Sequence, residues 1–137
     1  MLHRLILATA LLAALPARSE TPQQLLEGYA AQARSQVAGY AGPSAETGSR
    51  FFHARHSDWS CASCHTADPA TPGKHVVTGK QIAPLAPGVN AARFRDSARV
   101  EKWFKRNCND TLRRACTSAE KADVLAYLLS VPGGARP

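Results

Sequence analysis

Apolar residues recur every three to four positions in four stretches of this 137-residue chain, and that spacing predicts four helices. The first stretch opens at Thr21, a residue type that caps helices, with Pro22 in the first helical position and Gln24 placed to complete a capping box. Gly39 and the Gly42-Pro43 pair are expected to end this helix. Its predicted inner face carries Leu25, Leu26, Tyr29 and Ala33.

A second helix is expected to begin near Ser44 and to run through Phe51 and Phe52 toward residue 61. Gly48 lies inside it and lowers its helix propensity. Because glycine has no side chain, it also allows another helix to approach closely. A glycine inside this helix is therefore expected to have a role in packing.

Two further helices are predicted in the last third of the chain. One uses Asp96 or Ser97 as its cap, and the other opens with a capping box from Thr117 to Glu120 and runs to Pro132. The first of the two places four residues at spacings of three and four, which predicts one shared apolar face that includes an asparagine: Val100, Trp103, Phe104 and Asn107. The second is expected to point four residues inward: Val124, Tyr127, Leu128 and Val131.

Between residues 65 and 90 the chain is rich in proline and glycine and shows no sustained alternation of apolar and polar residues. This composition predicts irregular structure without strands. Neither an internal repeat nor a second Cys-x-x-Cys-His sequence is present, so we expect one domain. The predicted fold class is therefore all-α.

Residues 1–19 have the pattern of a secretory signal peptide. A polar start with His3 and Arg4 precedes an uncharged apolar run, and small residues follow it. An uncleaved anchor is the alternative, although the run is too short to span a bilayer. We predict a signal peptide at 1–19, a domain at 20–137, and export to the periplasm, where paired cysteines persist.

Seventeen lysines and arginines outnumber ten acidic residues, giving a net charge of +7. Cleavage after residue 19 would remove two arginines and no acid, which lowers the charge to +5. A basic face could steer an acidic redox partner, and a solvated helix surface is the alternative. Nucleic-acid binding is not expected, because export and the lack of a recognition motif argue against it. The cations concentrate at Arg93, Arg95, Arg99, Lys102, Lys105, Arg106, Arg113 and Arg114.

The stretch from Cys61 to His65 reads Cys-Ala-Ser-Cys-His, the pattern that attaches haem covalently. Two thiols one helical turn apart can reach the two vinyl groups of one porphyrin, and the adjacent imidazole can bind the iron. We therefore predict one haem c, held by Cys61 and Cys64, with His65 as the proximal ligand. The rival interpretations are a thioredoxin-like dithiol, which lacks its βαβ context here, and a zinc site shared with other cysteines.

Cys108 and Cys116 are spaced suitably for a disulfide in an exported protein, and two free buried thiols are the weaker alternative. A bridge would clamp the loop that follows Asn107 and restrain the backbone at that residue.

The other axial position of the iron is open from sequence alone. The only methionine is Met1, so a matured chain has no methionine ligand. His75 as the ligand would give a low-spin electron carrier with two imidazoles, whereas a carboxamide would be a weak ligand that reduction could release. The candidates are His53, His56, His75, Lys80, Asn107, water or no ligand.

Four segments resemble the sphaeroides haem protein (SHP) family of monohaem c-type cytochromes: TGKQIAPLAP at 78–87, DSARVEKW at 96–103, RNCN at 106–109 and EKADVLAYL at 120–128. The resemblance implies a class I cytochrome c fold with an extra N-terminal helix, in which the helix with Gly48 crosses the C-terminal helix at Tyr127. It also implies Cys61 and Cys64 as haem attachments, His65 as proximal ligand, Asn107 as a ferric ligand displaced on reduction, and a Cys108–Cys116 disulfide.

Members of that family are thought to bind diatomic gases in the ferrous state. They are thought to exchange electrons with a dihaem cytochrome c, often with a membrane cytochrome b upstream. The resemblance therefore favours a periplasmic cytochrome that binds O2, NO or CO when reduced. Two alternatives stay open: a plain carrier with His65 and His75 as axial ligands, and an oxidoreductase acting on oxygen or nitrogen oxides. For the enzymatic alternative, no proton-donating distal residue can be placed from sequence.

Overall fold

The computed structural model describes residues 20–133, so the predicted signal peptide at 1–19 and the last four residues lie outside the described part. Within that part no helix is long and apolar enough to cross a membrane. The elements, in chain order, are α1 (Pro22–Gln36), α2 (Ala45–His53), α3 (Cys61–His65), β1 (Gly73–Lys74), β2 (Gln81–Ile82), α4 (Ser97–Leu112) and α5 (Ser118–Ser130).

The predicted helix starts are confirmed by their caps. Thr21 and Gln24 form the capping box of α1, with Pro22 first in the helix, and Thr117 and Glu120 form that of α5. The side chain of Ser44 accepts a hydrogen bond from the Thr47 amide at the start of α2. These side chains satisfy amide groups that have no partner inside a helix, which is why the local signals locate the helix starts.

The second helix is shorter than predicted. It ends at His53, and residues 54–60 form a loop before the separate one-turn helix α3. Ser60 caps α3 and forms a reciprocal capping box with Ser63. This Ser-x-x-Ser signal is weaker than Ser-x-x-Glu, and the sequence interpretation overlooked it.

Helices α2 and α5 cross with their backbones in contact at Gly48. A Cβ atom added at Gly48 would overlap the carbonyl oxygen of Asp123 and lie 3.0 Å from the Cβ of Tyr127. The amide of Ser44 donates a hydrogen bond of 2.8 Å to the Asp123 carboxylate, which fixes the start of α2 on α5. The expected crossing near Tyr127 is confirmed, and it supplies the packing reason for Gly48.

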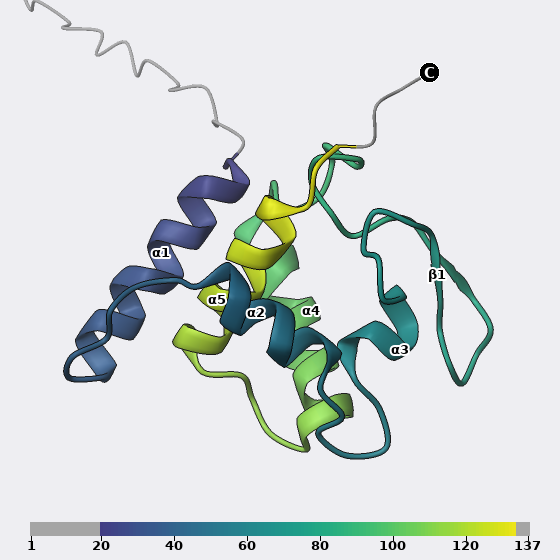
Figure 1. The fold of residues 1–137 in the computed structure, drawn as a ribbon, viewed down its shortest axis with the longest axis horizontal. Coiled ribbons are helices and arrows are strands. Elements are labelled where there is room, and N and C mark those ends of the chain that lie inside the picture. Colours follow the sequence, from purple (N-terminus) through teal and green to yellow (C-terminus); the bar gives the residue numbers. More distant parts are fainter. Residues whose placement is uncertain (1–19, 134–137) are drawn as a thin grey trace, which may run out of the picture.

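Helix α5 is central, with α1 packed along one side and α2 across it (Figure 1). One apolar cluster joins α1, α4 and α5, and a second joins α2 to α5 and extends to α3. The buried members of the first cluster are Leu25, Tyr29, Val100, Ala122 and Leu125, and those of the second are Phe52, Val124 and Leu128.

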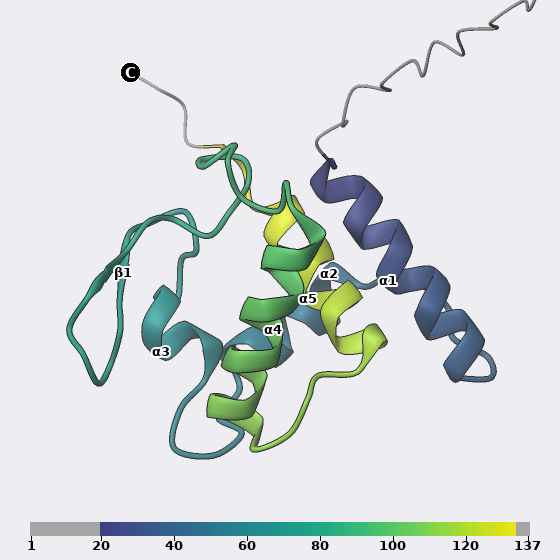
Figure 2. The ribbon, with the colours of Figure 1, turned by 180° about the vertical axis from the view of Figure 1, so that it is seen from behind.

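The segment between α3 and α4 is irregular, as predicted, apart from one short antiparallel hairpin (Figure 2). In that hairpin Gly73 pairs with Ile82, and Lys74 pairs with Gln81. The prediction of no strands is wrong at this point, because two-residue strands are too short to show an alternating pattern. The all-helical class is otherwise confirmed.

Replacing Gly48 by alanine should destabilise the protein by about 3 kcal/mol, because the added methyl group would force α2 away from α5. Guanidinium denaturation of the holoprotein measures this loss. Gly28→Ala is the matched control, since Gly28 lies inside α1 with nothing within 4 Å of an added Cβ. That control should leave stability unchanged or raise it by about 0.5–1 kcal/mol. Equal effects of the two substitutions would contradict the assigned role of Gly48.

Candidate haem site

The predicted haem-attachment residues lie on α3, where Cys61 and Cys64 are one helical turn apart and both have free thiols. Cys61 and Ala62 pack against the cluster of Phe52, Val124 and Leu128. Burial raises the pKa of the Cys61 thiol to about 11. The short helix is therefore held by its cap and by one apolar face against the core, and the buried Cys61 thiol is protonated at neutral pH.

The hairpin covers the end of α3. A Cβ atom at Gly73 would overlap the carbonyl oxygen of Cys64 and lie 3.0 Å from the Cα of His65. Only glycine lets the strand pass this close to the backbone of the motif. The structure thus requires glycine at position 73, whereas the sequence analysis predicted only that this segment is irregular.

His65 is positioned as a neutral imidazole. Its ring centroid lies 6.4 Å from that of Phe52. Burial, and to a lesser extent the positive charge of Arg93, lowers the pKa of His65 to about 4. A neutral imidazole has a free lone pair at physiological pH, as a metal ligand requires. The next residue, Thr66, has φ 64° and ψ 165°, a strained conformation for a residue with a side chain.

The prediction of one shared apolar face on α4 is wrong. Val100 and Cys108 are buried and Phe104 is half-buried, whereas Trp103 is 47% exposed and Asn107 is exposed. Positions 100, 104 and 108 form one i, i+4 row that faces the core, and positions 103 and 107 form the neighbouring row.

Asn107 lies inside α4 rather than at its end, because the helix continues to Leu112. Its main-chain carbonyl accepts a hydrogen bond of 2.8 Å from the Thr111 hydroxyl. In the part of the chain that the structure describes, the Asn107 carboxamide has no hydrogen-bond partner. Its backbone is therefore fixed, and its side chain is free to bind another group.

The three other histidines of the domain bond to nearby main chain. His53 has its two ring nitrogens 2.7 Å from the carbonyl oxygen of Ser49 and 2.9 Å from that of Ala67. Nε2 of His56 lies 2.9 Å from the carbonyl oxygen of Phe51. In His75, Nδ1 accepts hydrogen bonds from the amides of Val77 and Thr78, so a neutral ring carries its proton on Nε2.

Cys108 and Cys116 are joined by a disulfide with their Cα atoms 5.6 Å apart. Because both thiols are used in this bond, they cannot share a zinc ion with Cys61 and Cys64. No group of three potential metal-ligating side chains of the His, Cys, Asp or Glu type occurs between residues 20 and 133.

Two contacts that sequence reasoning missed connect the loop before α3 to the end of α4. The hydroxyl of Ser57 donates to the carbonyl of Thr111 at 2.7 Å, and Arg113 forms a 3.0 Å ion pair with Asp58. These pairs are more than 50 residues apart in sequence, so no local signal could have revealed them. They hold the haem-attachment loop against the helix that carries Asn107.

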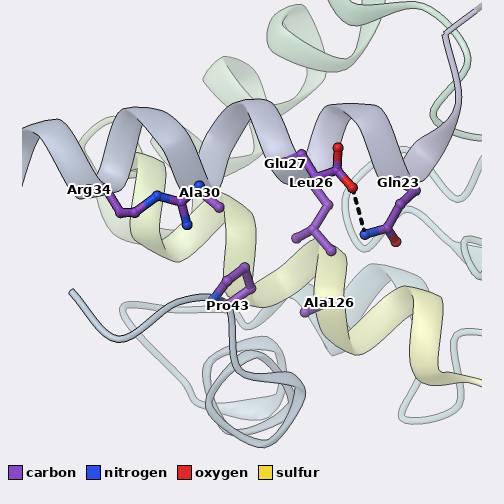
Figure 3. A pocket seen from close by; sticks show the side chains of 7 residues that line it. All are labelled: Gln23, Leu26, Glu27, Ala30, Arg34, Pro43 and Ala126. Carbon is purple, nitrogen blue, oxygen red and sulfur yellow. Dashed lines mark hydrogen bonds between the residues drawn. The ribbon is translucent and has the colours of Figure 1, made fainter.

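A cavity of about 330 Å³ lies elsewhere, between α1, the segment that precedes α2, and α5 (Figure 3). Leu26, Ala30, Pro43 and Ala126 provide its apolar surface, with Gln23, Glu27 and Arg34 also lining it. Its lining contains no cysteine or histidine, so it offers no attachment for haem.

Comparison with known proteins agrees with this arrangement. A sequence family described as a domain of unknown function (DUF1924) matches residues 38–128. The cytochrome c-type protein SHP of Cereibacter sphaeroides is 44% identical over 133 residues, which cover 93% of this chain and 98% of SHP. Cytochrome c'' of Methylophilus methylotrophus is 43% identical over 113 residues, which cover 79% of this chain and 78% of that protein.

Solved structures match as well. Oxidised cytochrome c'' of Methylophilus methylotrophus matches with a TM-score of 0.75 at 43% identity, over 80% of this chain and 94% of the other. Oxidised SHP, described as an oxygen-binding cytochrome c, matches with a TM-score of 0.72 at 45% identity, over 80% of this chain and 96% of the SHP chain. A solution structure of Methylophilus methylotrophus cytochrome c'', described in connection with haem-ligand detachment, has a TM-score of 0.72 at 43% identity, over 80% of this chain and 92% of the other. The chain belongs to the SHP and cytochrome c'' family.

Membership of this family makes the protein a haem c-type cytochrome with one covalently bound haem, and it confirms the predicted all-helical cytochrome fold. The donor set of the chain fits that cofactor. Two free thiols stand one turn apart on α3, and a neutral imidazole follows them directly.

Removing the disulfide with Cys108→Ser and Cys116→Ser should lower the free energy of unfolding by about 2–3 kcal/mol, because the bridge closes a short loop in the unfolded chain. Guanidinium denaturation of the oxidised holoprotein, with and without the substitutions, measures the difference. A variant as stable as the parent would contradict the expected contribution.

Proposed function

We propose that this protein is a periplasmic cytochrome that transfers electrons and binds a diatomic gas (O2, NO or CO) when its haem is reduced. The observation that carries the proposal is the exposed carboxamide of Asn107, which has no hydrogen-bond partner among residues 20–133. Two descriptions of relatives support it: SHP as oxygen-binding, and cytochrome c'' in connection with haem-ligand detachment. Haem iron supplies a one-electron centre and, when ferrous with an open axial position, a site for diatomic molecules.

In this proposal Cys61 and Cys64 attach the haem through thioether bonds, and His65 is the proximal ligand. The capping box of α3 and the contact of Cys61 with the Phe52 cluster hold the two sulfurs in a fixed relation. Burial keeps the imidazole of His65 neutral, and the close passage of Gly73 braces the backbone of the motif from the hairpin side.

Asn107 is the proposed sixth ligand in the ferric state and moves away on reduction. A carboxamide oxygen is a neutral, weak ligand, so its attraction to the metal falls when the metal loses a positive charge. The backbone at this position is held by the Thr111 hydroxyl and by the disulfide of the next residue, Cys108. Rotation of the Asn107 side chain is then enough to open the site, without unfolding of α4.

A low-spin centre with His65 and His75 as axial ligands is less well supported. Coordination through Nε2 of His75 needs a lone pair on that atom, whereas Nδ1 now accepts two amide hydrogen bonds. Both of those bonds would be lost when the proton moved to Nδ1. Asn107 has no such bonds to give up.

Export directed by residues 1–19, which are then cleaved off, would bring the chain to the periplasm, where the disulfide is stable. The proposed electron donor is a dihaem cytochrome c or another periplasmic redox protein, with a membrane cytochrome b upstream of it.

Substituting both Cys61 and Cys64 by alanine should abolish covalent haem attachment. Haem staining of a denaturing gel then disappears, while Cys61→Ala alone should shift the pyridine haemochrome band to that of a single thioether. The Cys108→Ser and Cys116→Ser variant is the control and should keep its stain. Haem that stays with the doubly substituted chain on the gel would contradict these attachments.

Asn107→Ala should change the ferric absorption spectrum and strengthen the binding of added azide to the ferric protein, because the anion no longer competes with the carboxamide. If the coordination is worth about 1.4 kcal/mol, the affinity rises about tenfold. Asn109→Ala is the matched control, since Asn109 is an exposed amide on the same helix. An unchanged spectrum and azide affinity in Asn107→Ala would refute the ligand assignment.

A further inference from the structure

Trp103 lies beside Asn107 on α4, because residues four positions apart in a helix are neighbours on its surface. Thr111 continues the same row one turn further along the helix. Its main-chain carbonyl accepts a hydrogen bond of 2.7 Å from Ser57, which lies in the loop that precedes α3. The row of Trp103, Asn107 and Thr111 therefore runs along α4 to the point where the haem-attachment loop meets this helix.

The packing of α4 does not account for a tryptophan at position 103. The helix is anchored in the core by Val100, Phe104 and Cys108, whereas the Trp103 side chain is 47% exposed. In the part of the chain that the structure describes, Trp103 joins neither apolar cluster, and its indole N–H donates no hydrogen bond. A large aromatic side chain thus lies outside the core and next to the proposed iron ligand.

The Trp103 ring is held from the side of the row that faces away from the core. The Arg106 guanidinium lies 5.7 Å from the ring centre, within the range of a cation–π contact. Arg106 is itself 4.0 Å from the Asp110 carboxylate, one turn further on. These contacts restrict rotation of the ring, so it keeps its place beside position 107.

We propose that Trp103 limits the size of the molecule that can take the place of the Asn107 carboxamide. This inference rests on the proposed function, in which that carboxamide is the ferric sixth ligand and leaves on reduction. Cβ atoms four residues apart on a helix are separated by about 5–6 Å, and a tryptophan side chain is large enough to reach across that gap. A diatomic molecule fits in the space that a carboxamide gives up, whereas a longer ligand meets the ring.

Such a residue determines selectivity by size. Shortening the side chain at position 103 should favour long ligands over short ones, because only the long ones reach the ring. A side chain that merely stabilised the fold or the cofactor would change the affinities for short and long ligands by the same factor. The ratio of the two affinities therefore separates a specificity-determining role from a structural one.

The test measures the binding of carbon monoxide and of n-butyl isocyanide to the ferrous holoprotein by titration. Both are neutral ligands of ferrous haem that bind through carbon, and they differ in length. Trp103→Ala removes the ring, Trp103→Leu is a milder truncation that keeps an apolar side chain, and Trp103→Phe keeps a ring. Val37→Ala is the matched control, because Val37 is an apolar residue with the same 47% exposure at the C-terminal cap of α1.

In Trp103→Ala the affinity for n-butyl isocyanide, relative to that for carbon monoxide, should rise about tenfold. Trp103→Leu should show a smaller rise, while Trp103→Phe and Val37→Ala should stay near the parental ratio. A parental ratio in both truncated variants at position 103 would overturn the proposal. A shift of equal size in Val37→Ala would also contradict it.

Failure of the proposed function gives a different result. A ferrous parent that binds neither ligand would refute gas binding and, with it, this inference. If the parent binds both ligands and the ratio does not respond to position 103, only the role of Trp103 is wrong.

The ferric spectrum provides an independent check. Trp103→Leu should keep the parental ferric spectrum, because Asn107 is still present, whereas Asn107→Ala should change it. A changed ferric spectrum in Trp103→Leu would mean that Trp103 holds the carboxamide in place, and the proposed role in size selection would then be wrong.

Discussion

The contact between the backbones of α2 and α5 at Gly48 determines where the haem site can form. Because nothing but hydrogen separates the helices there, Phe52 one turn later reaches Val124 and Leu128 and becomes fully buried. Cys61 and Ala62 of α3 pack against that cluster, and the ring of His65 lies near Phe52. The position of the haem motif thus depends on a crossing that lies thirteen residues before it in the chain.

Helix α3 could not persist without this support. A single helical turn costs more in backbone entropy than its few hydrogen bonds return. Three features compensate: the Ser60 and Ser63 capping box, the apolar contact of Cys61, and the Gly73 backbone pressed against Cys64. The strained backbone at Thr66 lies immediately after this supported turn, where the chain must leave the motif sharply.

The features that could be predicted from sequence are those with a local physical cause. Caps predict where helices begin, because they satisfy amides within three residues, and the Cys-x-x-Cys-His spacing follows from the dimensions of one porphyrin. The face of α4 was mispredicted because Trp103 is apolar, and apolarity alone does not distinguish a core position from an exposed one. The links from Ser57 to Thr111 and from Asp58 to Arg113 could not be predicted, since they depend on how distant segments fold together.

Helix α4 separates two tasks on adjacent rows of residues. Val100, Phe104 and Cys108 anchor the helix, while Trp103 and Asn107 take no part in that packing. A side chain at position 107 can therefore be exchanged without disturbing the core. In evolutionary terms, this lets the chemistry at that position drift by single substitutions while the scaffold stays under separate selection for folding.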